Sequence, residues 1–137
     1  MRLNLLCALA TATLALTACN KSETPAEVQQ DVANAQAEGQ RDVADARSDA
    51  KEATADADKN VADATADRDA EDVAEQAHDA DETAAEGNSK IMIAQAEASH
   101  KVAVQKCEAL KDAAQEQCKG DADETLDQAK AAAKTNR

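Results

Sequence analysis

Asp31-Val-Ala-Asn-Ala is followed eleven residues later by Asp42-Val-Ala-Asp-Ala, and this short unit decides how the chain folds. Altered copies return as Val61-Ala-Asp-Ala and Asp72-Val-Ala-Glu-Gln. Ala, Glu, Gln, Lys and Arg, which are common throughout residues 26–86, are the best helix formers, although the many Asp residues weaken the preference. We therefore predict a long helical repeat over residues 26–86.

Small apolar residues follow one face of this predicted helix. They advance nine steps in the 33 residues from Val28 to Val61, a mean of about 3.67 residues per step. An eleven-residue period favours a straight or slightly right-handed pairing of helices. The face is mostly Ala, so close approach is possible but weakly stabilised, and Gly39 costs about 1 kcal/mol of helix stability. The ten positions are Val28, Val32, Ala35, Gly39, Val43, Ala46, Ala50, Ala53, Ala57 and Val61.

The composition argues against a compact globular core. The chain has no Phe, Tyr or Trp, and only twelve Val, Ile, Leu or Met residues follow Cys19. Each Ala offers one methyl group, worth less than about 1 kcal/mol when fully buried. Two arrangements remain open, namely long helices that pair through small side chains, or substantial disorder. We predict an all-α fold without a compact core, with disorder as the alternative for part of the chain.

Leu16-Thr17-Ala18-Cys19 closes a short apolar run that follows a positively charged start. The run is too short for a membrane span, which needs about 20 apolar residues. Its charged start, apolar core and small-small-Cys end resemble the lipobox of bacterial lipoproteins. The resemblance implies that residues 1–18, including Cys7, are removed as a signal peptide and that Cys19 carries lipid.

Two signals divide the remaining chain. Pro25 suits the first turn of a helix and follows Thr24, which can cap it. Gly87-Asn88-Ser89 predicts a break, with Gly ending one helix and Ser capping the next. A helix over 26–86 would extend roughly 90 Å, the dimension of a spacer. The expected segments are the signal peptide 1–18, the lipidated Cys and linker 19–25, the repeat 26–86, the break 87–89, a helical hairpin 90–134 and a tail 135–137.

Cys107 and Cys118 are expected to pair within that hairpin. On one unbroken helix they would lie about 16 Å apart, beyond the reach of a disulfide. A turn between Leu110 and Asp112 would place them opposite each other, and the oxidising periplasm implied by the lipobox favours their oxidation. The short loop would contribute about 3 kcal/mol. An intermolecular disulfide or free thiols remain alternatives.

The net charge of −13 lies mainly in one half of the chain. Residues 41–86 hold sixteen Asp or Glu against five Lys or Arg, whereas residues 90–137 hold eight of each. The acidic surface expected over residues 41–86 repels nucleic acid and attracts cations only diffusely. Asp56-Ala-Asp58-Lys-Asn60 imitates the start of an EF-hand loop, but Val61 occupies the position that requires Gly. We expect no metal site and no cofactor.

No catalytic constellation is expected either. His100 lies about 10 Å from Cys107 along a helix, too far for a Cys–His pair, and His78 is expected to be a surface residue. The sequence contains no Gly-rich phosphate loop and no Ser-His-Asp arrangement. The protein is therefore predicted not to be an enzyme.

The lipobox and the Ala-rich rod together are similar to the murein lipoprotein class of envelope lipoproteins. That class can attach to peptidoglycan through a C-terminal lysine, whereas this chain ends in Lys134-Thr135-Asn136-Arg137. Lys106-Cys107-Glu108-Ala109-Leu110 followed by Cys118 is similar to a segment of small uncharacterised periplasmic proteins of proteobacteria. Both resemblances imply a location in the cell envelope. Asn20 resembles a signal for export to the outer membrane, and this is the location that we favour. Lys21-Ser22 resembles a signal for retention at the inner membrane.

These features predict a structural, non-catalytic spacer that faces the periplasm. Its expected partners are the membrane, through lipid on Cys19, and a second copy, an envelope protein or peptidoglycan. An alternative is a stress-protective or cation-buffering lipoprotein similar to the desiccation proteins with eleven-residue repeats. A third and remoter reading is a redox sensor that uses Cys107 and Cys118.

Overall fold

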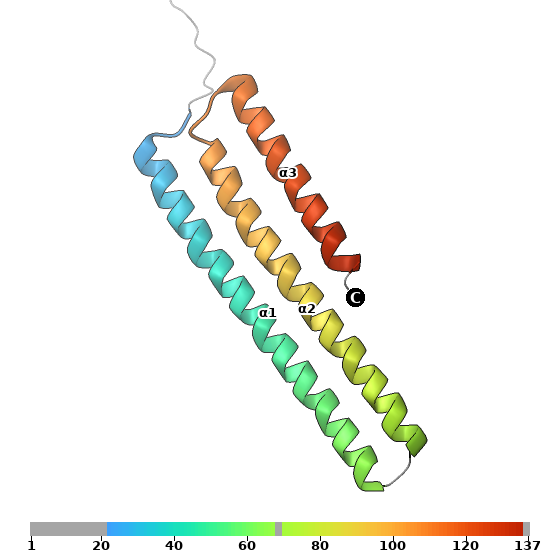
Figure 1. Cartoon of the computed structure of the whole chain (residues 1–137). Coiled ribbons are helices and arrows are strands. Elements are labelled where there is room, and N and C mark those ends of the chain that lie inside the picture. Colours follow the sequence, from blue (N-terminus) through green and yellow to red (C-terminus); the bar gives the residue numbers. More distant parts are fainter. Residues whose placement is uncertain (1–21, 68–69, 136–137) are drawn as a thin grey trace, which may run out of the picture.

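The computed structural model describes residues 22–67 and 70–135, nearly all of them helical. They form the three helices α1 (Pro25–Asp67), α2 (Ala70–Cys107) and α3 (Asp112–Thr135) (Figure 1). The all-α class predicted from the sequence is confirmed. The expected signal peptide 1–18 and Cys19 lie outside the described residues.

Helix α2 is the middle element of the molecule. It runs back along α1, and the shorter α3 then lies against the half of α2 that is nearer the start of α1 (Figure 1). Within the described ranges, α1 and α3 have no Cα atoms within 8 Å of each other. The structure is therefore an open rod made of two helix pairs that share α2. At 1.5 Å per residue, α1 gives it a length of about 65 Å.

A capping box starts α1 at the position that Thr24 and Pro25 predict. The backbone N–H of Glu27 donates to Oγ1 of Thr24 at 3.3 Å, and the backbone N–H of Thr24 donates to Oε2 of Glu27 at 2.8 Å. The two residues thus satisfy backbone donors that a helix start leaves unpaired.

The prediction of one helix over 26–86 is wrong, because the chain reverses between Asp67 and Ala70. A face of small residues adds little stability to an isolated helix. It is buried only when a partner helix of matching period packs against it. By returning along α1, α2 provides that partner. Nine of the ten positions of the predicted face are buried or half-buried, and only Ala53 is exposed. The repeat therefore forms a hairpin rather than an extended 90 Å spacer.

The predicted break at 87–89 is also wrong, since these residues lie inside α2. Gly87 and Ser89 are buried, and Ser89 is only 4% exposed. A Cβ built on Gly87 would lie 2.9 Å from the Cβ of Ala50. This Gly therefore permits a close approach between two backbones and does not end a helix. The hairpin expected over 90–134 correspondingly uses an α2 that begins at Ala70.

A second close contact of the same kind fixes the register of α1 and α2. A Cβ built on Gly39 would lie 2.5 Å from the Cβ of Ala98. Gly39 and Ala50 are eleven residues apart on α1, and their partners Ala98 and Gly87 are eleven apart on α2. Both helices therefore carry the same eleven-residue period, read in opposite directions.

The two contacts are related by an approximate two-fold symmetry that the sequence analysis missed. Exchange of the helices maps Gly39 onto Gly87 and Ala50 onto Ala98, in each case a shift of 48 residues. The signal in the sequence is the repetition of Ala37-Glu38-Gly39 as Ala85-Glu86-Gly87. Each helix thus offers one Gly and one Ala to its partner.

We expect Gly39→Ala to destabilise the protein by about 1–3 kcal/mol, because the added methyl group would force the two backbones apart. Thermal unfolding followed by circular dichroism measures the effect. Gly120→Ala is the matched control, since no atom lies within 4 Å of its added Cβ. It should stabilise α3 by about 0.5–1 kcal/mol through helix propensity. Equal stabilisation by both variants would contradict the close contact, and adding Ala98→Gly to Gly39→Ala should recover stability.

Candidate functional site

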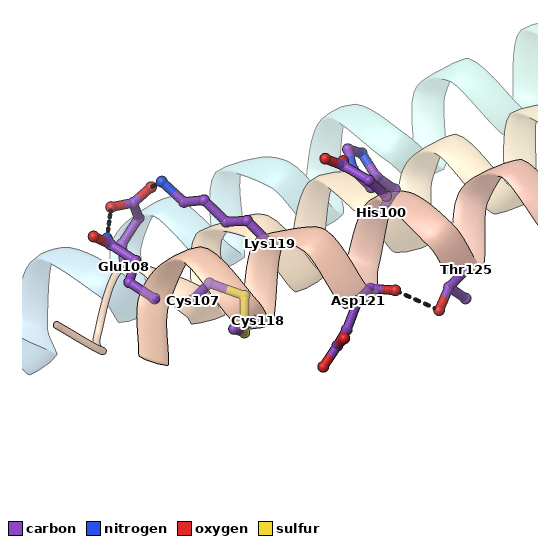
Figure 2. The surroundings of a disulfide bond; sticks show 9 residues. His100, Cys107, Glu108, Cys118, Lys119, Asp121 and Thr125 are labelled. Atoms are coloured by element: carbon purple, nitrogen blue, oxygen red, sulfur yellow. Dashed lines mark hydrogen bonds and ion pairs between the residues drawn. A yellow bond between two sulfur atoms is a disulfide. The ribbon is translucent and has the colours of Figure 1, made fainter. Parts of the chain in front are cut away.

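A disulfide, hydrogen bonds and an ion pair join the residues at one end of the rod. We call this surface, made of residues 22–24, 107–112 and 118, the disulfide end. Cys107 closes α2 and is completely buried, and its disulfide to Cys118 on α3 joins Cα atoms 5.7 Å apart (Figure 2). The structure thus brings together the two cysteines that the sequence places across a turn.

The turn itself lies where the sequence analysis expected it. The backbone N–H of Leu110 donates to the carbonyl of Cys107 at 2.9 Å, and α3 begins at Asp112. Asp112 adopts a φ of 51°, in the left-handed region that Asp tolerates better than most residues. The disulfide and this turn together hold the segment between α2 and α3.

Glu108 connects three parts of the disulfide end. One of its carboxylate oxygens pairs with Nζ of Lys119 at 2.6 Å (Figure 2), and the other accepts a hydrogen bond from the side chain of Gln115. Its carbonyl accepts the backbone N–H of Glu23 at 3.3 Å. The segment that precedes α1 is therefore attached to the turn between α2 and α3.

Glu23 is a carboxyl group at this end with a perturbed environment. The residue is half-buried, but its Oε2 is fully buried and accepts no hydrogen bond from the described part of the chain. Loss of contact with water raises the pKa of Glu23 above its ordinary value of 4.5, and the neighbouring carboxylates of Asp31, Glu108 and Glu27 raise it further. Lys119 opposes this shift. Ionisation of Glu23 is therefore less favourable in the folded protein than in the unfolded chain.

Polar pairs hold α3 along α2 beyond the disulfide. Nε2 of His100 lies 2.6 Å from Oδ1 of Asp123, and Nζ of Lys130 lies 2.8 Å from a carboxylate oxygen of Glu97. His100 is therefore not a plain surface residue, because it contacts the neighbouring helix. Its separation from Asp123 in the sequence gave no signal for this contact.

Lys101 performs a similar task between α2 and α1. Its Nζ lies 2.7 Å from Oε1 of Glu38 and 2.8 Å from Oδ2 of Asp42. Hydrogen bonds to Asp42 and Glu38 raise the pKa of Lys101 above its ordinary value. The three side chains remain substantially exposed, so their main effect is to favour this register of the helix pair rather than to add much stability.

The opposite end of the rod is strongly acidic. We call residues 52–67 and 70–86 the acidic end; together they contain twelve Asp or Glu and one Lys. A hydrogen bond to the backbone and the nearby carboxylate of Glu82 raise the pKa of His78, the only His in these two ranges. The side chain is exposed, as the sequence predicts. The acidic end is therefore a strongly charged surface.

In residues 22–67 and 70–135, no group of three or more His, Cys, Asp or Glu side chains is arranged to hold a metal ion. None of the helices in the same ranges is long and apolar enough to span a bilayer. The proposed lipidation site, Cys19, precedes the first described residue, Ser22, by three positions. Comparisons of the chain with protein-family models, with curated proteins and with solved structures gave no match.

Reduction of the Cys107–Cys118 disulfide should cost about 3 kcal/mol, because the unfolded chain regains the freedom of the short loop. The loss should fall mainly on α3, since α1 and α2 keep their own register without it. Amide hydrogen exchange of residues 112–135, with and without reductant, measures this. A Cys107→Ala and Cys118→Ala double variant should match the reduced protein and ignore reductant. Equal loss of protection in all three helices would contradict this prediction.

Glu23→Gln should stabilise the protein at pH 7 and have no effect below about pH 4. Because the pKa of Glu23 is higher in the folded than in the unfolded state, the stability that it contributes is complete below 4.5 and is lost as the pH rises through the raised pKa. Thermal unfolding at a series of pH values measures this. Glu52→Gln, at an exposed position on α1, is the control for net charge. Equal stabilisation by both variants would show that burial of Glu23 plays no part.

Proposed function

We propose that the protein is a lipid-anchored spacer of the bacterial cell envelope. In this proposal, acyl chains on Cys19 hold the disulfide end at a membrane surface, with the outer membrane favoured. The rod then carries the acidic end about 60 Å into the periplasm. The observation that carries the proposal is the lipobox-like segment Leu16-Thr17-Ala18-Cys19, which stands directly before the described rod.

The arrangement of the helices supports this proposal. The segment that precedes α1 lies at the disulfide end, where Glu23 donates to the carbonyl of Glu108, whereas α1 turns into α2 at the opposite end (Figure 1). A lipid on Cys19 would therefore be near one end of the rod and far from the acidic end. The helix hairpin also shortens the expected spacer from roughly 90 Å to about 65 Å.

Electrostatics supports an upright orientation of the rod. Anionic headgroups repel the acidic end, while screening at physiological salt limits that repulsion to within about 8–10 Å of the membrane. An acidic end that comes within this distance is thus repelled by the membrane surface. Beyond it, the electrostatic repulsion is screened by salt. Most of residues 90–135, which carry eight acidic and seven basic side chains, lie together with the first half of α1 in the half of the rod nearer the proposed anchor (Figure 1).

The disulfide is a further supporting observation. Structural disulfides persist in oxidising compartments such as the periplasm and are rare in the cytosol. The ordered helices of residues 22–67 and 70–135 favour a spacer over a chain that remains disordered until it is dried. We therefore propose a single function, in which the rod presents the acidic end to the periplasm.

Replacement of Cys19 tests the proposal. The full-length protein, produced in a Gram-negative host, should be recovered in the membrane fraction, cleaved before Cys19 and heavier by the mass of a lipid modification. Cys19→Ser should abolish the modification and the cleavage, because the acylated thiol is required for both. Membrane fractionation and intact mass spectrometry measure these properties.

Cys7→Ser is the matched control, since it removes a thiol from the segment that should be discarded. It should leave lipidation and membrane recovery unchanged. An unmodified chain, or equal effects of Cys7→Ser and Cys19→Ser, would overturn the proposed function.

A further inference from the structure

Leu110 is exposed at the tip of the disulfide end. The residue is 40% exposed, and Met92, at 38%, is the other large apolar side chain exposed in residues 22–67 and 70–135. Leu110 belongs to the turn that joins α2 and α3, where its neighbours Ala109 and Lys111 are also exposed. At 40% exposure, part of this apolar side chain is accessible to another apolar phase.

The turn lies close to the place where the proposed anchor begins. Its residue Glu108 accepts the backbone N–H of Glu23 at 3.3 Å. Ser22 precedes Glu23, and Cys19 precedes Ser22 by three residues, which span at most about 10 Å when extended. Lipid on Cys19 would therefore bring a membrane surface within reach of Leu110. This step rests on the proposed function.

We propose that the segment from Glu108 to Lys111 is a second membrane contact, in which Leu110 inserts into the lipid interface beside the acyl chains on Cys19. The segment is held in place before it meets lipid, because the Cys107–Cys118 disulfide closes it and the pair between Glu108 and Lys119 supports it. Little conformational freedom is then lost on insertion, which favours binding.

Apolar burial carries this contact, and charge has a minor part. Lys106 and Lys111 are exposed and can approach lipid phosphates. Glu108 and Asp112 in the same turn offset these two charges, and Glu108 is already paired with Lys119. The contact should therefore form on zwitterionic lipid and change little with added anionic lipid.

The sequence allows a direct test, because the chain contains no Trp. Leu110→Trp introduces a single fluorophore at the proposed contact, and Met92→Trp introduces one at a similarly exposed position on α2. Each full-length variant is purified from bacterial membranes in its lipidated form and reconstituted into phosphatidylcholine vesicles. Quenching by brominated phosphatidylcholine and by aqueous acrylamide is then measured.

We expect brominated lipid to quench the Trp of Leu110→Trp at least about threefold more strongly than that of Met92→Trp, with the opposite order for acrylamide. Emission from Leu110→Trp should also shift to shorter wavelength when vesicles are added. Circular dichroism of the two variants controls for the fold. A fully lipidated, vesicle-bound Leu110→Trp that acrylamide quenches as strongly as Met92→Trp would overturn the second contact alone.

The proposed anchor fails in a different way. If mass spectrometry finds no lipid on Cys19 and the protein does not float with vesicles, the proposed function is overturned, and the second contact with it. Leu110→Trp combined with Cys19→Ser completes the design. Its fluorescence should not change when vesicles are added, because the turn is not brought to the membrane.

Discussion

The fold depends on how closely the backbones of α1 and α2 approach. A helix face of alanines offers single methyl groups, and dispersion contacts of that size are useful only at short range. Gly39 against Ala98 and Gly87 against Ala50 allow that range at two levels of the rod. Between these levels, half-buried Val43 and Ile91 contribute larger side chains without separating the helices. The absence of a side chain at the two Gly positions thus lets α1 and α2 come close enough for their small side chains to make stabilising contacts.

Helix α3 is held by a different means. It spans 24 residues against the 43 of α1, and its buried positions within α3 are Ala122 and Ala133. With so little apolar surface to bury, a helix of this length depends on covalent and polar attachment to α2. The disulfide holds one end, and the pairs His100–Asp123 and Glu97–Lys130 follow along its length. The two halves of the molecule therefore obtain cohesion from unlike interactions.

The sequence predicts periods and pairings better than it predicts reversals. The eleven-residue period identified the inner face of α1 almost residue by residue, and the spacing of Cys107 and Cys118 identified the turn between them. The reversal after Asp67 was not predicted from the sequence, because charged residues continue through it without a Gly or Pro to mark it. The prediction of a helix end at Gly87 was wrong, because a Gly beside Asn and Ser is equally consistent with a helix end and with a close contact between two helices. Only the opposing Ala50 distinguishes these roles, and local sequence does not reveal that neighbour.

The antiparallel register restricts how such a protein can change length during evolution. A single insertion in one arm would move Gly39 away from Ala98 or Gly87 away from Ala50 and place methyl groups in collision. Insertion of eleven residues in each arm at matching levels would instead preserve both contacts and the face that α1 turns toward α2. At 1.5 Å per residue, each such paired insertion lengthens the rod by about 16 Å. Relatives of this chain should therefore come in discrete lengths, with gains and losses matched across the hairpin.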